Sequence, residues 1–195
     1  MTRDTVTALT YSILIILISV LIVSLSHSLH QKELLTPTAQ ENDLIFTTYF
    51  QTGNPLHMTD IKGITENEVE HMFAVRKLLL IASILAFTLG IFLVVLWEKV
   101  QEKMAIFLSP LLILWVSAPA FLFSNFDKLF LTFHRILFPQ GNYFFPESSV
   151  LISTYPATFF ATMGLLIVKY YLFISVGLLF IKIVSDKIYV LIQRF

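Results

Sequence analysis

Four stretches of the chain are long enough and apolar enough to cross a membrane as helices. They lie at about residues 6–26, 78–97, 104–123 and 159–181. A helix needs roughly 20 mostly apolar residues to span the hydrocarbon core of a bilayer, which is about 30 Å thick. The pattern therefore predicts an all-α integral membrane protein, with four transmembrane helices in a single membrane domain covering residues 1–195.

The polar segments between these stretches differ greatly in length. Only residues 98–103 separate the second and third spans, whereas residues 28–77 and 124–156 form long loops rich in Pro, Asn and Thr. With four spans, both long loops lie on one side of the membrane and both termini on the other. Lys and Arg near the span ends number six on each side, but those on the side of the termini fall in shorter segments. Because positive charge concentrates on the cytoplasmic side, we expect cytoplasmic termini and extracytoplasmic loops.

The first apolar stretch has a second interpretation, as a cleavable signal peptide. Ser24-Leu25-Ser26 loosely resembles a small-x-small cleavage site. However, Arg3 is offset by Asp4, and the apolar stretch is longer than the core of a typical signal peptide. An uncleaved transmembrane helix is therefore favoured.

The two long loops are predicted to form a partly helical cap. Thr65 and Glu68 have the spacing of a capping box, and no Pro or Gly follows until Gly90. A helix should therefore begin near Thr65 and run straight into the second span. A short helix is also expected within residues 42–50. The second long loop contains apolar residues at helical spacing, which predicts an amphipathic helix in the outer interface: Phe126, Leu129, Phe130, Phe133 and Leu137.

Composition supports a membrane protein and excludes several classes of function. Charged residues make up 13% of the chain and hydrophobic residues 56%, whereas a soluble domain carries about twice that charged fraction. The 13 basic and 13 acidic residues cancel, so no nucleic-acid partner is expected. The absence of cysteine excludes disulfides, thiol nucleophiles and Cys-ligated metals. No nucleophile elbow, phosphate-binding loop or dinucleotide motif is present, and no cofactor is expected.

Two of the five histidines are the main candidates for chemistry. His71 lies on the predicted projection of the second helix, one turn after Glu68, which could orient its ring. His134 lies on the predicted interfacial helix at the same membrane depth. The pair could form a polar site, or both rings could simply hydrogen-bond water and lipid headgroups. The cations beside them are Arg76, Lys77 and Arg135.

Three other ionisable residues leave alternatives open. His27 and His30 have a spacing that could hold a metal, but no acidic residue is adjacent and no HExxH motif follows, so no metal site is expected. Lys169 lies inside the fourth span. It either faces the bundle interior for a functional reason or reaches along the helix to the interface.

Four segments resemble the motifs of a known family. Residues 68–78 are similar to an acidic position followed by His-Met-x-Asp-Val-Arg/Lys, and residues 133–138 to aromatic-His-x-x-Phe/Leu-Phe. Residues 141–146 resemble Asn-aromatic-x-Phe-x-Pro, and residues 151–160 resemble Leu-Ile-x-x-Phe/Leu-Pro-Glu-x-Phe-Phe/Trp. Together they resemble the bacterial lipoprotein intramolecular transacylase family, four-span acyltransferases of low-GC Gram-positive bacteria.

The resemblance implies a reaction and a set of residues. The substrate would be a diacylated lipoprotein in a phospholipid membrane, and the sn-2 acyl chain of its diacylglyceryl-Cys would move to the α-amine of the same Cys. The product would be the lyso-form lipoprotein. Two histidines lie at the reaction centre of the family, and they correspond to His71 and His134. Residues expected to bind the substrate are Arg76, Lys77, Arg135 and Tyr143, and the supporting residues are Glu68 and Lys169.

The chain departs from the family pattern at several acidic positions. Ala74, Ser149 and Ala157 stand where acids are expected, and Arg135 stands where an acid is frequent. These departures bear on rate and substrate preference. His-based chemistry remains consistent with the residues, because aminolysis of an ester requires a base near neutrality and a donor to the oxyanion. We assign His134 as the base, with the reverse assignment open, and keep a non-catalytic membrane accessory subunit as the alternative function.

Overall fold

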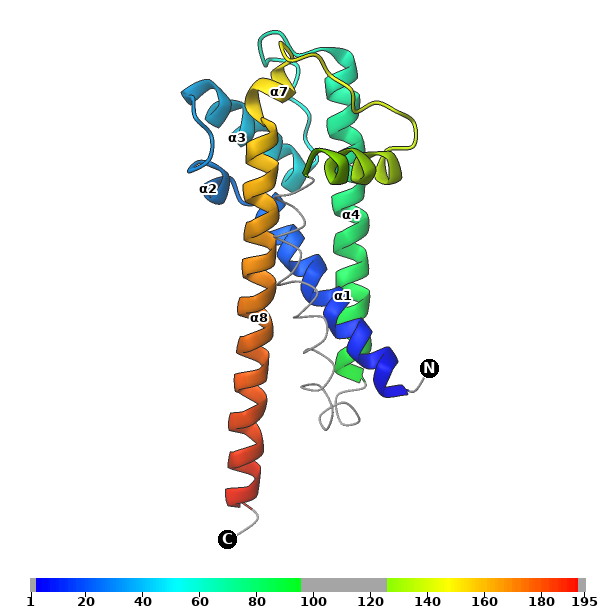
Figure 1. Cartoon of the computed structure of the whole chain (residues 1–195), viewed down its shortest axis with the longest axis vertical. Coiled ribbons are helices and arrows are strands. Elements are labelled where there is room, and N and C mark those ends of the chain that lie inside the picture. Colours follow the sequence, from blue (N-terminus) through cyan, green and yellow to red (C-terminus); the bar gives the residue numbers. More distant parts are fainter. Residues whose placement is uncertain (1–2, 96–125, 193–195) are drawn as a thin grey trace.

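The regular elements of the protein are helices wherever the computed structural model describes the chain, at residues 3–95 and 126–192 (Figure 1). An unlabelled helix covers residues 126–137. The labelled helices are α1 (Arg3–Ser24), α2 (His27–His30), α3 (Pro37–Thr52), α4 (Glu66–Val95), α7 (Val150–Thr154) and α8 (Ala157–Ile192).

In the part of the chain that the structure describes, two helices have the length and composition to cross a membrane. These are α4 and the part of α8 at Ala157–Ser185, while α1 contains a shorter apolar stretch at Leu9–Ser24. Large apolar side chains point outward along both, such as Phe87 at 72% exposure and Phe173 at 77%. A helix in a soluble core would bury these groups, so their exposure fits contact with lipid. The predicted third span, residues 104–123, lies outside the described residues.

The beginning of α4 confirms the predicted capping box. The backbone amide of Thr65 donates to Glu68 Oε2 at 2.8 Å, and the amide of Glu68 donates to Thr65 Oγ1 at 3.3 Å. The helix then continues without interruption into the apolar stretch that starts at Leu78. Residues 66–77 carry five charged side chains, so this part of α4 projects beyond the segment that we treat as membrane-spanning.

Two helices are longer than predicted. α3 begins at Pro37, with Thr36 as its N-cap, and ends at Thr52, with Gly53 as its C-cap at a left-handed φ of 77°. Thr followed by Pro favours a helix start and Gly favours a helix end, and these signals extend the helix beyond the expected range 42–50. α8 covers the predicted span at 159–181 and continues as a helix to Ile192.

The polar segments fold against one end of the three long helices. In Figure 1, α2, α3, α7 and the helix at 126–137 gather at that end, and both termini lie toward the other. α1 packs against both α4 and α8. One buried cluster joins α1, α3, α4, α7 and α8, and it includes Val23, Phe46, Met58, Met72, Leu151 and Phe159. Each such side chain stabilises the fold by about 1.5–3 kcal/mol when buried. The short helices at this end and the loops between them, which we call the cap, are therefore packed firmly onto the long helices.

Candidate active site

The structure brings His71 and His134 together, although 63 positions separate them in the sequence. His71 extends from the projecting part of α4 and His134 from the helix at 126–137. The ring centroids are 6.2 Å apart and the ring planes differ by 20°. Both residues are buried. Two imidazoles at this separation can contact a single reacting group.

Aromatic side chains surround the two imidazoles. The ring of Phe138 lies 4.7 Å from that of His71 and 5.5 Å from that of His134. Phe145 lies 5.4 Å from the His71 ring. Tyr143, which was expected to bind the substrate, lies 5.5 Å from the His134 ring. These rings exclude water from the imidazoles, and a charged imidazolium is therefore disfavoured here.

The orientation of His134 is fixed by its own helix. Its Nδ1 lies 2.8 Å from the backbone carbonyl oxygen of Phe130, which can only accept, so Nδ1 carries a proton. Burial lowers the pKa of His134, and the hydrogen bond to Phe130 partly opposes that shift. The ring is neutral at pH 7, and its Nε2 keeps a free lone pair that can accept a proton.

His71 is also neutral at physiological pH. Burial lowers its pKa to about 4, the nearby His134 adds to this decrease, and the nearby Asn142 partly opposes it. Its Nδ1 is buried and has no hydrogen-bond partner within the described part of the chain. A buried polar atom without a partner is uncommon, so this nitrogen is available to a molecule that enters the site.

Glu68 does not orient His71, contrary to the expectation from their spacing. Its Oε2 accepts hydrogen bonds from the amide and the hydroxyl of Thr65, and its Oε1 accepts from the amide of Leu151 at 2.9 Å. The carboxylate is completely buried. Glu68 therefore joins the start of α4 to the start of α7, and so holds the end of the 139–149 loop that carries Tyr143 and Phe145.

The predicted cations occupy different environments. Arg76 is half-buried; its Nε donates to the carbonyl of Tyr49 at 3.2 Å, and its guanidinium lies 5.6 Å from the centre of the Tyr49 ring. Arg76 therefore packs against the last turn of α3. Lys77 and Arg135 are exposed. Lys169 is also exposed on α8, which favours the alternative in which its side chain reaches along the helix to the interface.

The residues that replace acidic family positions lie at helix starts or beside the site. Ser149 is the N-cap of α7, and its hydroxyl accepts from the amide of Ile152 at 3.2 Å. Ser and Asp cap helices almost equally well, so this replacement preserves the local structure. Ala157 is the exposed first residue of α8. Ala74 is half-buried on α4, one turn after His71.

A second polar cluster has an acid that the sequence did not reveal. His27 and His30, which had no adjacent acidic residue, both hydrogen-bond to Asp43 of α3. Asp43 is completely buried. The separations of 13 and 16 residues fit no local motif, and α3 had been predicted without a chemical role. By contrast, His57 is an exposed loop residue near Asp60.

Comparisons with known proteins place the chain in a family. The family model for the lipoprotein intramolecular transacylase Lit matches residues 5–160, which include both histidines. The fold is similar to the solved structure of the membrane-integral lipoprotein intramolecular transacylase Lit from Bacillus cereus, with 21% identity, a TM-score of 0.71, and coverage of 95% of this chain and 96% of that chain. No curated protein matches the sequence. The chain is thus a membrane-integral member of the Lit family of lipoprotein intramolecular transacylases.

Proposed function

We propose that this protein moves the sn-2 acyl chain of a diacylglyceryl-Cys lipoprotein to the α-amine of the same Cys. The observation that carries the proposal is the buried pair of neutral imidazoles, 6.2 Å apart, within the segment that the Lit family model covers. Neutral rings in a dry aromatic site are suited to move protons between a nucleophile and a leaving group.

His134 acts as the general base in this proposal. Its Nδ1 proton is held by the carbonyl of Phe130, so Nε2 is the basic nitrogen. An α-amino group has a pKa of about 7.7–8.0, and a useful fraction is therefore neutral at pH 7. As the amine nitrogen attacks the ester carbonyl, Nε2 of His134 removes its proton.

His71 acts on the oxygen atoms of the ester. An N–H of its imidazole donates to the oxyanion of the tetrahedral intermediate or to the departing glycerol oxygen. Its buried Nδ1, which has no partner among the residues described, supports a role for this ring toward a ligand. A hydrogen bond to a developing oxyanion gains strength in a water-excluded site.

The overall reaction needs no acyl-enzyme and no cofactor. A C–N bond forms, the ester C–O bond breaks, and the proton removed from the amine returns to the glycerol oxygen. Because the donor and the acceptor belong to one molecule, binding it folded supplies a high effective concentration. The aromatic residues around the imidazoles disfavour water as a competing nucleophile.

In the topology that we propose, the reaction takes place at the extracytoplasmic face of the cell membrane. In this topology the chain crosses the membrane four times and both termini are cytoplasmic. The cap then lies at the outer leaflet, where the diacylated lipoprotein resides. Lys77 and Arg135, which are exposed, contact lipid headgroups, and Tyr143 contacts the substrate beside His134.

Mass spectrometry of a lipoprotein's N-terminal lipopeptide tests the proposal. The protein is expressed in a host that lacks N-acylation, and transfer of one acyl chain from the glyceryl group to the amine is expected. His71→Ala and His134→Ala should abolish transfer while the protein remains folded. The matched control is His57→Ala, because His57 is exposed, and this variant should retain activity. An unchanged diacylglyceryl form with the wild-type protein would instead indicate a non-catalytic accessory subunit.

A further inference from the structure

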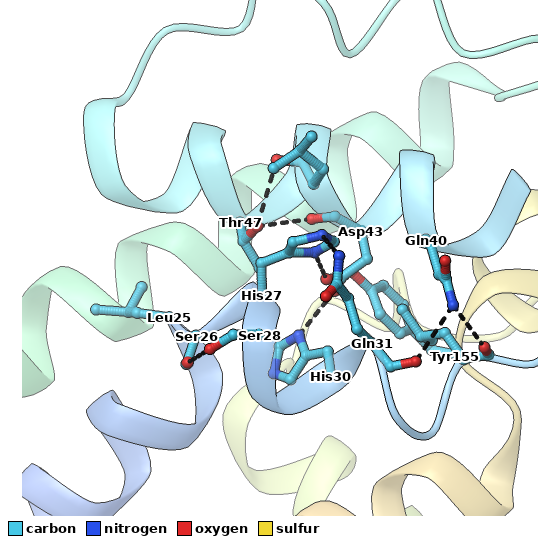
Figure 2. A network of polar contacts seen from close by, with 12 residues as sticks. Leu25, Ser26, His27, Ser28, His30, Gln31, Gln40, Asp43, Thr47 and Tyr155 are labelled. Atoms are coloured by element: carbon cyan, nitrogen blue, oxygen red, sulfur yellow. Dashed lines mark hydrogen bonds and ion pairs between the residues drawn. The ribbon is translucent and has the colours of Figure 1, made fainter. Parts of the chain in front are cut away.

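Asp43 is the centre of a buried polar cluster within the cap. Its Oδ2 lies 2.5 Å from Nδ1 of His27, and its Oδ1 lies 2.7 Å from both Nδ1 of His30 and the hydroxyl of Tyr155. Figure 2 shows these three side chains converging on the carboxylate. The two histidines belong to α2, and Tyr155 lies at the junction between α7 and α8. Because Asp43 itself belongs to α3, its carboxylate connects three parts of the chain.

Hydrogen-bond accounting shows how the charge of this carboxylate is balanced. Gln31 Nε2 can only donate to His27 Nε2, so the proton of His27 is on Nδ1 and points to Asp43. His30 Nε2 must donate to the carbonyl of Val23, and its Nδ1 bonds Asp43 as well. One additional proton is therefore shared by His30 and Asp43. The pair is neutral overall, which limits the cost of burying it.

The cluster is complete without a metal ion. Both Nδ1 atoms are used by Asp43, and both Nε2 atoms already have partners in Gln31 and Val23. Among the residues that the structure describes, no group of His, Asp and Glu could hold a metal. The cluster therefore has a structural role, and the residues that it holds in place indicate what that role is.

Tyr155 connects the cluster to the candidate active site. It lies in a non-helical conformation between α7 and α8. Its ring lies 6.1 Å from that of Phe160, which lies 5.0 Å from the ring of Phe130. The Phe130 ring in turn lies 4.1 Å from the His134 ring, tilted by 45°, and the backbone carbonyl of Phe130 accepts the hydrogen bond from His134 Nδ1. The contacts are continuous from Asp43 to the imidazole that we assign as the base.

We propose that Asp43 is a positioning residue for His134. It holds Tyr155 at the start of α8, and the rings of Phe160 and Phe130 transmit that position to the carbonyl that orients His134. The effect on catalysis rests on the proposed transacylase function, whereas the effect on the His134 ring does not. Asp43 itself contacts neither imidazole of the candidate active site in this arrangement.

Tyr155→Phe is the mildest test, because it removes one hydroxyl and keeps the ring. We expect the transfer rate at saturating substrate to fall about tenfold, a size typical of coupling through packed networks, with KM unchanged. Looser packing around His134 should admit water and raise its pKa toward the ordinary value, so the acid limb of the rate profile should move to higher pH. Asp43→Asn should act similarly, and the double variant should lose little more.

Tyr49→Phe is the matched control, since it removes a hydroxyl from another buried tyrosine, on α3. It should leave the rate, the pH profile and the His134 ring unchanged. The second measurement is NMR of ¹⁵N-labelled histidine in the full-length protein in detergent. Tyr155→Phe should change the tautomer balance and the titration of His134, an effect that lower stability alone would not produce in the folded protein.

The two proposals fail separately. If the wild-type protein transfers no acyl chain, the proposed function is wrong, and the NMR comparison still decides the role of Asp43. If folded Tyr155→Phe keeps the wild-type His134 resonances and titration, the positioning role is refuted, whatever the activity. Should Asp43→Asn fail to fold, Tyr155→Phe alone supplies both measurements.

Discussion

Replacing Glu68 tests whether its carboxylate holds the cap or acts on His71. The structure gives it three donors, namely the amide and hydroxyl of Thr65 and the amide of Leu151. Glu68→Ala would remove the capping partner of α4 and leave the buried Leu151 amide unsatisfied. Glu68→Gln would keep the shape and one accepting oxygen, but its NH₂ group could not accept from Thr65.

The magnitude follows from these contacts. An unsatisfied buried amide costs about 1–3 kcal/mol, and loss of a helix cap costs about 1 kcal/mol. With the lost charge-assisted hydrogen bonds, Glu68→Ala should reduce the free energy of unfolding by about 4 kcal/mol, and Glu68→Gln by about 2 kcal/mol. For a chain of this length, 4 kcal/mol corresponds to a decrease in Tm on the order of 10 °C.

Thermal unfolding in detergent is the assay, and Glu70→Gln is the control. Glu70 is exposed on the same helix, and its replacement should leave Tm unchanged, because surface substitutions are usually nearly neutral. NMR titration of His71 supplies the second readout and should show the wild-type pKa in folded Glu68→Gln. A wild-type Tm together with a shifted His71 pKa would refute the reasoning, because it would mean that the carboxylate acts on the ring.

Three further predictions concern pH and the helix ends. The pKa of His71 in the folded protein is lowered to about 4, below its ordinary value in the unfolded chain. As pH decreases from about 6.5 to 4, the unfolded chain binds this proton more readily than the folded protein, so Tm should fall. This dependence of Tm on pH should be weaker in His71→Ala. Gly53→Ala should lower Tm by several degrees, because φ is 77° and a Cβ would collide with the Arg76 guanidinium. Ser149→Ala should lower the free energy of unfolding by about 1 kcal/mol, whereas Ser149→Asp should leave it unchanged; denaturation of both variants checks this.

Local signals in the sequence were sufficient for much of the helical structure. The Thr65–Glu68 spacing predicted the start of α4, and uninterrupted helix formers predicted its passage into the apolar stretch. Helical spacing of apolar residues likewise predicted the helix at 126–137. These features depend on residues within a few positions of one another, so propensity and periodicity determine them.

Contacts across the cap could not be predicted in the same way. Spacing placed Glu68 and His71 on one helix face, but the carboxylate is satisfied by backbone amides, one of them 83 positions away. Asp43 lies on α3, where no local motif marks it as the partner of His27 and His30. Lys169 is exposed because of the rotation of α8, which the apolar composition of that helix leaves undetermined.

The depth of the histidine pair is itself an argument for chemistry on a lipid ester. His71 precedes the start of the apolar stretch at Leu78 by seven residues, which corresponds to about 10 Å along the helix. The polar interface of a bilayer extends about 5–8 Å beyond the hydrocarbon core on each side, so His71 lies just beyond this layer if α4 is upright, and helix tilt brings it slightly closer. Acyl ester bonds lie within this interface, as does a lipid-modified N-terminal amine. Under the proposed function, these groups would therefore rise only a few ångströms to meet the imidazoles beside Phe138 and Phe145, with the acyl chains still in the membrane.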